Sequence, residues 1–210
     1  MSSEKYLQKV TVGEITVHNQ KIELCEYDDN WPVLFQKEAA KIFNALGTTA
    51  LGIEHVGSTS VPGLCAKPII DILLCVEDSA KESEYGKQLE RVGYLLRIRE
   101  PKWFEHRMFK GKDPAVNLHV FSQNCEEAER MTAFRDWLCT HESDRNLYAE
   151  AKRQLAKQTW RYIQDYADAK THVVQEIMGR ITEQSNSSVT QEIWEHSVCR
   201  ESYLSQESVL

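Results

Sequence analysis

The segment from Ile69 to Val76 constrains the fold most, because Asp71 is its only residue that is not apolar. A strand with apolar residues on both faces belongs in the interior of a sheet that is covered on both sides. A lone carboxylate in such a strand is unfavourable unless it is paired or bound to a cation. The sequence therefore predicts a central strand in which Asp71 is either a functional acid or a partner in a buried ion pair.

Periodicity predicts the other elements. Asn30 and Pro32 open a helix whose buried stripe runs from Trp31 to Leu46, and Asn124 with Glu127 resembles a capping box. Further strands are predicted at Lys21–Glu26, Leu51–Val56, Tyr94–Ile98, Trp103–Phe109 and Val116–Ser122, with a helix at Lys81–Arg91 and three helices after Asn124. This order predicts an α+β fold, a mixed β-sheet covered by helices and followed by a C-terminal helical segment.

Residues 1–180 are expected to form one domain and residues 181–210 an acidic polar tail. The tail holds one arginine against five glutamates. Its apolar residues could form one short docking helix; they are Ile193, Trp194, Val198 and Tyr203.

Charge and apolar content exclude several classes of protein. Lys and Arg number 25 against 32 Asp and Glu, a net charge of −7, so a generic basic nucleic-acid-coating protein is excluded but a local basic patch is not. No apolar run approaches the roughly 20 residues of a membrane helix, so no membrane partner is expected. The six cysteines are scattered and the N-terminus lacks the apolar core of a secretory signal, which favours free thiols and a cytoplasmic location.

The turn at Gly57–Ser58 follows a predicted strand and lacks bulk, so backbone N–H groups and hydroxyls there can approach an anion closely. Ser58 and Ser60 are candidate nucleophiles only if a base lies within hydrogen-bond distance; otherwise they bind phosphate or backbone. Lys67 could hold an anion or neutralise Asp71. A plain turn remains the alternative for Gly57–Ser58.

Residues 54–64 (EHVGSTSVPGL) and 67–72 (KPIIDI) resemble the signature of the GrpB family, which belongs to the nucleotidyltransferase superfamily. The resemblance continues through residues 99–111, 117–121, 134–138 and 166–170 and spans about residues 21–180. It implies a nucleotidyltransferase-like fold. In that superfamily a Gly-Ser turn precedes three acids that hold two Mg²⁺ ions and orient a nucleoside triphosphate.

This chain departs from that acid pattern. Asp71 fills the first position, Leu73 stands at the second, and His119 stands at the expected third. Because Mg²⁺ prefers oxygen ligands, only weak Mg²⁺ binding at Asp71 is expected. His119 beside Asp71 could instead be a general base or a satisfied core histidine. The resulting candidates are catalytic Asp71, His119, Ser58 and His55, and substrate-binding Gly57, Ser58, Ser60, Lys67, Glu54, Glu105, His106 and Arg107.

Three functions remain open on sequence alone. The first is a GrpB-like transferase that acts on a nucleotide or an activated, adenylate- or aminoacyl-bearing substrate. The second is implied by a resemblance of this family to small fungal synthases of arginine-containing cyclic dipeptides. In that function Glu54, Glu105 or Asp71 would hold the arginine, and a helical stripe of Arg153, Lys157 and Arg161 would contact charged tRNA. The third is a non-catalytic nucleotide- or metabolite-binding module, which Leu73 favours.

Overall fold

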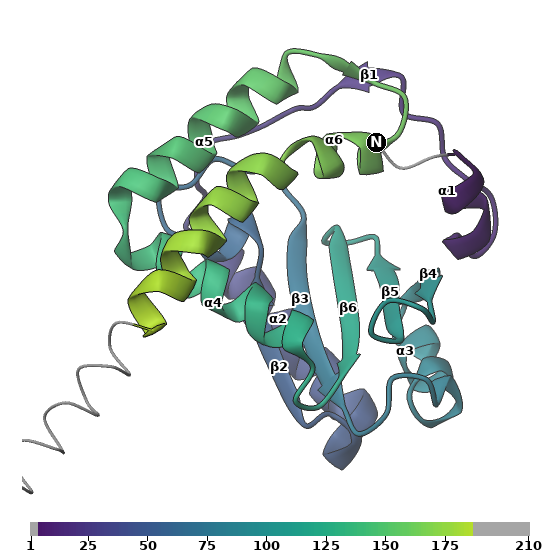
Figure 1. Cartoon of the computed structure of the whole chain (residues 1–210). Coiled ribbons are helices and arrows are strands. Elements are labelled where there is room, and N and C mark those ends of the chain that lie inside the picture. The colour runs from purple at the N-terminus through teal and green to yellow at the C-terminus, as the bar shows by residue number, and fades with distance from the viewer. Residues whose placement is uncertain (1–3, 187–210) are drawn as a thin grey trace, which may run out of the picture.

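A five-stranded mixed sheet forms the centre of the computed structural model, which describes residues 4–186 (Figure 1). β3 and β6 run parallel, and the other neighbouring strands are antiparallel. The spatial order is β2 (Gly52–Val56), β3 (Ile70–Val76), β6 (Val116–Ser122), β5 (His106–Gly111) and β4 (Leu95–Glu100). The predicted α+β class and the interior position of the Asp71 strand are therefore confirmed.

One face of the sheet is the main apolar core. Ile70, Ile72 and Leu74 of β3 pack there against α2 (Trp31–Leu46) and α3 (Gly86–Arg91). Residues two apart on a strand share a face, so Asp71 and Leu73 lie on the opposite face. Leu73 is buried there beneath α4 (Glu126–Thr140).

A second core lies beside the sheet. The turn after β2 contributes Val61 and Leu64, which pack against α5 (Glu142–Ala156) and a helix over residues 171–186. The short α6 (Ile163–Ala169) lies between these two helices in chain order (Figure 1). This packing holds α5 against the turn that follows β2.

The N-terminal residues close the far edge. α1 (Glu4–Val10) leads to a bridge between Thr11 and Ile98 of β4, and β1 (Gln20–Lys21) pairs with β7 (Thr159–Trp160). None of the helices in the described part of the chain is long and apolar enough to cross a membrane. The five cysteines within it are free, as predicted.

Several predicted elements differ from the structure. Of Lys21–Glu26 only Lys21 lies in a strand, and Cys25 makes an isolated bridge to Ala66. The predicted helix at Lys81–Arg91 is regular only from Gly86, because buried Tyr85 leaves helical geometry with φ −137° and bonds to Ser79 O at 2.5 Å.

The capping box at Asn124 is also wrong. Asn124 has φ +60°, and Cys125 caps α4 without a side-chain hydrogen bond. Four helical segments, not three, follow Asn124 within the described residues. The apolar tail residues Ile193, Trp194, Val198 and Tyr203 lie outside the described part.

Candidate functional site

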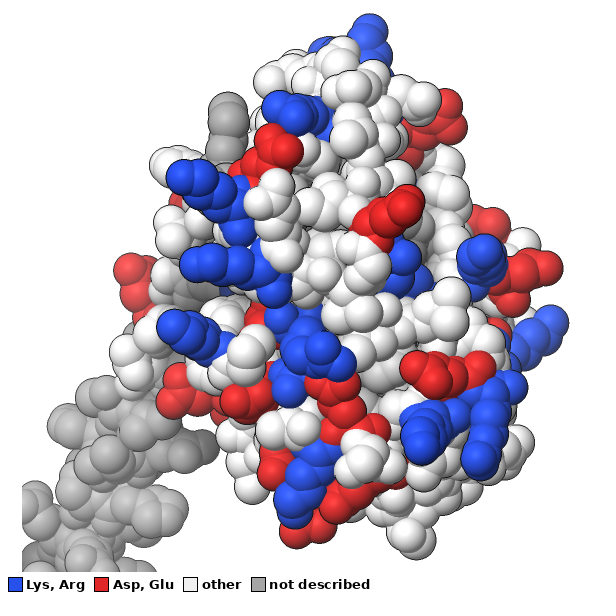
Figure 2. Space-filling view, turned by 90° about the vertical axis from the view of Figure 1, so that its right-hand side faces the viewer, with Lys and Arg blue, Asp and Glu red and all other residues white. Residues whose placement is uncertain are grey.

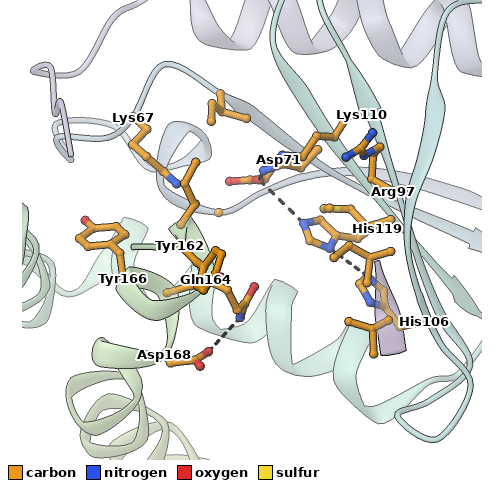
Figure 3. A pocket seen from close by; sticks show the side chains of 18 of the residues that line it. Lys67, Asp71, Arg97, His106, Lys110, His119, Tyr162, Gln164, Tyr166 and Asp168 are labelled. Atoms are coloured by element: carbon orange, nitrogen blue, oxygen red, sulfur yellow. Dashed lines mark hydrogen bonds and ion pairs between the residues drawn. The ribbon is translucent and has the colours of Figure 1, made fainter. Parts of the chain in front are cut away.

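A cavity of about 830 Å³ lies between the sheet face that carries Asp71 and the segment around α6 (Figure 3). Asp71 of β3, His119 of β6 and His106 of β5 point into it from the sheet. Tyr162 and Tyr166 line the opposite side. The cavity therefore gathers side chains from four segments that are distant in sequence.

The Gly57 turn is fitted directly against Asp71. Antiparallel pairing of β2 with β3 sets Val56 opposite Asp71, so the next residue, Gly57, passes over the carboxylate. Gly57 has φ +70°, and a Cβ placed on it would lie 2.5 Å from Asp71 Oδ2. Only glycine satisfies both conditions. The predicted single site formed by the turn and the acid is present.

Asp71 is held ionised in this site. Asn117 Nδ2 donates to Asp71 Oδ1 at 2.8 Å, and His119 Nε2 lies 3.8 Å from the same oxygen. Burial alone would raise the pKa of Asp71, but its interactions with His119, Asn117 and Lys67 outweigh burial and keep the pKa below its usual value. The carboxylate therefore supplies fixed negative charge beside His119.

A chain of hydrogen bonds continues from His119 across the sheet. His119 Nδ1 lies 3.1 Å from His106 Nε2 and the two rings stack at 17°, while His106 Nδ1 lies 2.7 Å from Glu100 Oε2. Tyr6 donates its hydroxyl to Glu100 Oε1. Burial and the nearby His119 outweigh Glu100 and lower the pKa of His106, so His106 is neutral near pH 7.

That network assigns the tautomers of both histidines. Neutral His106 donates a hydrogen bond from Nδ1–H to Glu100, so its Nε2 accepts a hydrogen bond from His119 Nδ1–H. His119 Nε2 then faces Asp71 Oδ1 at 3.8 Å, and a proton bound there lies between the imidazole and the carboxylate. A base oriented in this way can accept a proton, and the carboxylate stabilises the imidazolium that forms.

Six basic side chains line the same cavity. Burial lowers the pKa of Lys67 to about 8 and that of Lys152 to about 7. Lys152 Nζ lies 2.9 Å from Ser58 Oγ and also contacts Cys65 O. The full set is Lys67, Arg97, Lys110, Arg130, Lys152 and Lys170. Cationic groups at this density suit a phosphate or carboxylate ligand.

Of the predicted site residues, six line the cavity: Gly57, Ser58, Lys67, Asp71, His106 and His119. Glu54, His55 and Ser60 do not. His55 points to the core face, stacks on Phe35 at 4.7 Å and has a pKa lowered to about 4 by burial. Glu54 pairs with Arg135 of α4 at 2.9 Å, and Ser60 Oγ donates to Gly57 O at 2.6 Å.

Glu105 and Arg107 also lie outside the cavity. β5 begins at His106, and Glu105 precedes it with φ +50°, so Glu105 is not part of the strand. Arg107 is buried on the core face, where it pairs with Glu82 at 2.5 Å and with Glu105 at 3.1 Å. This arginine is neutralised by its structural partners.

The predicted basic stripe on one helix is wrong as well. α5 ends at Ala156, and Thr159–Trp160 forms β7, so Arg161 is not on that helix. Arg153 pairs with Glu26 at 3.2 Å and Arg161 with Glu4 at 3.1 Å. On the face seen in Figure 2, Lys and Arg lie among Asp and Glu throughout, so that face is not uniformly basic.

The residues present do not fit a two-Mg²⁺ centre. Leu73 occupies the second acid position and is packed against Val56 and Phe121. Beside Asp71 the next strand presents the Asn117 amide and the His119 imidazole, which are poorer Mg²⁺ ligands than carboxylates. Within residues 4–186 no group of three His, Cys, Asp or Glu side chains is arranged to hold a metal ion.

Sequence reasoning missed several cavity residues, and Lys152 is the most informative. It lies 2% exposed on the buried side of α5 with Tyr148 and Ala149. A lysine four residues after a buried tyrosine on an amphipathic helix was the available signal. Glu100 and Tyr6 carried no such signal, because their contact joins residues 94 positions apart.

The fold and cavity define an α+β domain with an acid–histidine site under a glycine turn. The family model described as GrpB protein matches residues 21–180, so the chain belongs to the GrpB family. It is 61% identical over 178 residues to UPF0157 protein BH1888 of Halalkalibacterium halodurans, covering 85% of this chain and 91% of that protein.

Two other relatives carry the family name. The Glutamate-rich protein GrpB of Alkalihalophilus pseudofirmus is 27% identical over 171 residues, covering 79% of this chain and 98% of that one. The crystal structure of GrpB from Enterococcus faecalis aligns with a TM-score of 0.67 and 30% identity, covering 78% of this chain and 99% of that chain. The resemblance noted in the sequence thus extends to the fold.

Proposed function

We propose that this protein is a transferase whose cavity binds a nucleotide or another activated, adenylate- or aminoacyl-bearing substrate. The observation that carries the proposal is the joint placement of a base and of cationic groups in one cavity. His119 Nε2 faces Asp71, and Lys67 and Lys110 line the wall beside them. The cations suit the phosphate of the activating group, and His119 suits removal of a proton from the acceptor.

The proposed division of work follows from the surroundings of each group. Asp71 orients His119 and stabilises its protonated form. His106 and Glu100 set the tautomer of His119 through the hydrogen bond at its Nδ1. No step is assigned to Mg²⁺, because the acid positions that would hold two ions are incomplete. Binding is therefore expected to proceed without added metal.

Calorimetric titration with ATP and with CTP, with and without Mg²⁺, tests the proposal. We expect saturable binding of at least one nucleotide that Mg²⁺ does not strengthen. Lys67→Gln is expected to weaken it at least tenfold, while Lys87→Gln, an exposed lysine of α3 on the core side, leaves it unchanged. Absence of binding by wild type, or equal loss in both variants, would contradict the proposal.

The non-catalytic alternative is favoured by one observation, the packed Leu73 in place of an acid. Incubation with nucleotide and with charged tRNA, followed by mass analysis of small products, separates the two. Turnover lost in His119→Gln supports the transferase. Nucleotide binding with no product in either mixture supports a binding module. A cyclic dipeptide formed from arginyl-tRNA would support the synthase, with Asp71 as the cavity carboxylate that holds the arginine.

A further inference from the structure

Ser58 and Lys152 meet inside the cavity although 94 residues separate them. Lys152 reaches from α5, is 2% exposed, and places Nζ 2.9 Å from Ser58 Oγ. Its second contact is the carbonyl of Cys65. The condition set by the sequence for a nucleophilic serine, a base within hydrogen-bond distance, is met by a residue that the sequence did not indicate.

The hydrogen bonds of Lys152 go to two uncharged oxygens. Nζ donates to the Ser58 hydroxyl and to the Cys65 carbonyl, and within residues 4–186 no carboxylate forms a hydrogen bond or ion pair with it. A neutral amine can donate one N–H to Cys65 O and accept the hydroxyl proton of Ser58. Burial lowers the pKa of Lys152 to about 7, which leaves much of it neutral at physiological pH.

We propose that Ser58 is a covalent nucleophile with Lys152 as its general base, and that the transferred group is an acyl group. This inference rests on the proposed function and narrows its substrate to an activated carboxylic acid, an acyl adenylate or an acyl ester. The alternative role for the pair, holding a phosphate, is an outcome of the test below.

The two half-reactions balance as follows. Ser58 Oγ attacks the acyl carbon, Lys152 takes the hydroxyl proton, and the bond to the activating group breaks, leaving an ester on Ser58. The acceptor amine or hydroxyl then attacks that ester and gives its proton to His119 Nε2. The bond between the acyl carbon and Ser58 Oγ breaks, Lys152 returns its proton to Oγ, and His119 releases its proton to solvent.

Each base therefore serves one half-reaction. Lys152 lies within hydrogen-bond distance of Ser58. His119 lies on the other side of Asp71 from the turn that contains Ser58. Asp71 contacts both sides, since its carboxylate lies under Gly57 and beside His119. This arrangement gives the acid a positioning role between two proton acceptors.

Acylation of the full chain by p-nitrophenyl acetate tests the dyad. We expect a stoichiometric burst of p-nitrophenolate and an acetyl group located on Ser58 by peptide mass spectrometry. Ser58→Ala should abolish the adduct, and Lys152→Met should slow its formation by roughly 10²–10⁴-fold. Lys152→Arg should not rescue it, because arginine does not become neutral.

Ser60→Ala is the matched control, because Ser60 Oγ bonds to Gly57 O and does not line the cavity. Its burst should equal that of wild type. The burst rate should rise with pH to a plateau with a midpoint near 7. The groups whose charge bears on Lys152 are Cys65, Lys170, Arg153 and Asp71, and the Tyr148 ring lies 4.9 Å away.

An adduct on another residue, no adduct in wild type, or an unchanged burst in Lys152→Met would overturn the dyad. Should Lys152→Met fail to fold by circular dichroism, Ser58→Ala and the pH midpoint decide the question. Loss of ATP binding in Ser58→Ala without any wild-type adduct would show that the pair holds phosphate. An adduct on Ser58 without nucleotide binding would instead contradict nucleotide binding and leave the dyad standing.

Discussion

The two faces of the five-stranded sheet are made by the same strands yet differ in chemistry. On the core face, alternate residues of β3 and β6 are apolar and fully buried, as Ile72 and Leu118 are. On the cavity face, Asp71, Asn117 and His119 occupy the positions between them. The strand period of two lets one segment carry both a core and a site.

The titratable groups also differ between the faces. On the core face, Arg107 is buried and forms an ion pair with Glu82. On the cavity face, neighbouring His106 belongs to a chain of five groups that runs from Tyr6 to Asp71, and Asp71 lines the cavity. A buried charge with fixed partners is structural, whereas an array that ends in a cavity can exchange a proton with a ligand.

The largest predicted effect is on the core face. Ile72→Ala removes a fully buried side chain and should lower the free energy of unfolding by about 2–5 kcal/mol. Nucleotide affinity per folded molecule should stay unchanged, because the side chain points away from the cavity. Urea denaturation and calorimetry measure the two quantities. A fall in the nucleotide affinity of fully folded Ile72→Ala would show that the two faces are not independent.

Gly57→Ala should combine a stability cost with loss of binding. The positive φ and the contact with Asp71 together predict a loss of roughly 2–4 kcal/mol. Gly63→Ala is the matched control, because Gly63 has φ +78° but no atom within 4 Å of an added Cβ. Gly63→Ala should lose only the part of the stability that comes from the positive φ, and it should keep nucleotide binding. Equal losses in both variants would mean that Asp71 is not crowded by the turn.

His55 makes the core face sensitive to acid. Its folded pKa of about 4 lies below the unfolded value of about 6.5, so between these values the unfolded chain binds more protons. Stability should therefore rise with pH from 4 to 6.5, by at most about 1.4 kcal/mol per pH unit from this residue, and be fully present above 6.5.

Urea denaturation of His55→Gln across that range measures this contribution. The slope of stability against pH should become shallower, with the remainder due in part to His106, whose pKa is also lowered. An unchanged slope would show that His55 is protonated in the folded protein.

The smallest stability effect is expected on the cavity face. His119→Gln keeps a polar group in a partly exposed position and should change the free energy of unfolding by less than about 1 kcal/mol. Acylation of Ser58 should proceed, but transfer to an acceptor should slow by roughly 10²–10⁴-fold, so the acyl adduct should persist. Intact-mass spectrometry over time measures this. Rapid turnover of the adduct would remove His119 from the second half-reaction.

Local signals predicted the sheet well. The run at residues 69–76 and the segment Val116–Ser122 fall within one residue of their observed strands, because their apolar patterns are strong. The helix at Trp31–Leu46 was equally clear from Pro32 and its apolar spacing. Weak patterns failed. The segment Lys21–Glu26 alternates like a strand but lacks a continuous partner strand.

For the site, the sequence predicted the turn, the acid and both histidines, since they lie in or beside strong strands. It placed Arg107 and Glu105 in the site, because one sequence does not show which face of β5 the cavity lies on or that the strand begins only at His106. It also predicted a stripe through Arg161, since helical spacing cannot reveal that α5 stops at Ala156.

The sequence by itself determined that Asp71 sits in a buried strand and that a glycine turn ends the preceding strand, because period, apolarity and backbone freedom are local properties. Only the tertiary structure decided that Lys152 meets Ser58 and that Tyr6 meets Glu100. Each pair is 94 residues apart, and the packing of α5 and of α1 against other elements brings it together. Contacts at that separation depend on the whole fold, which no local pattern encodes.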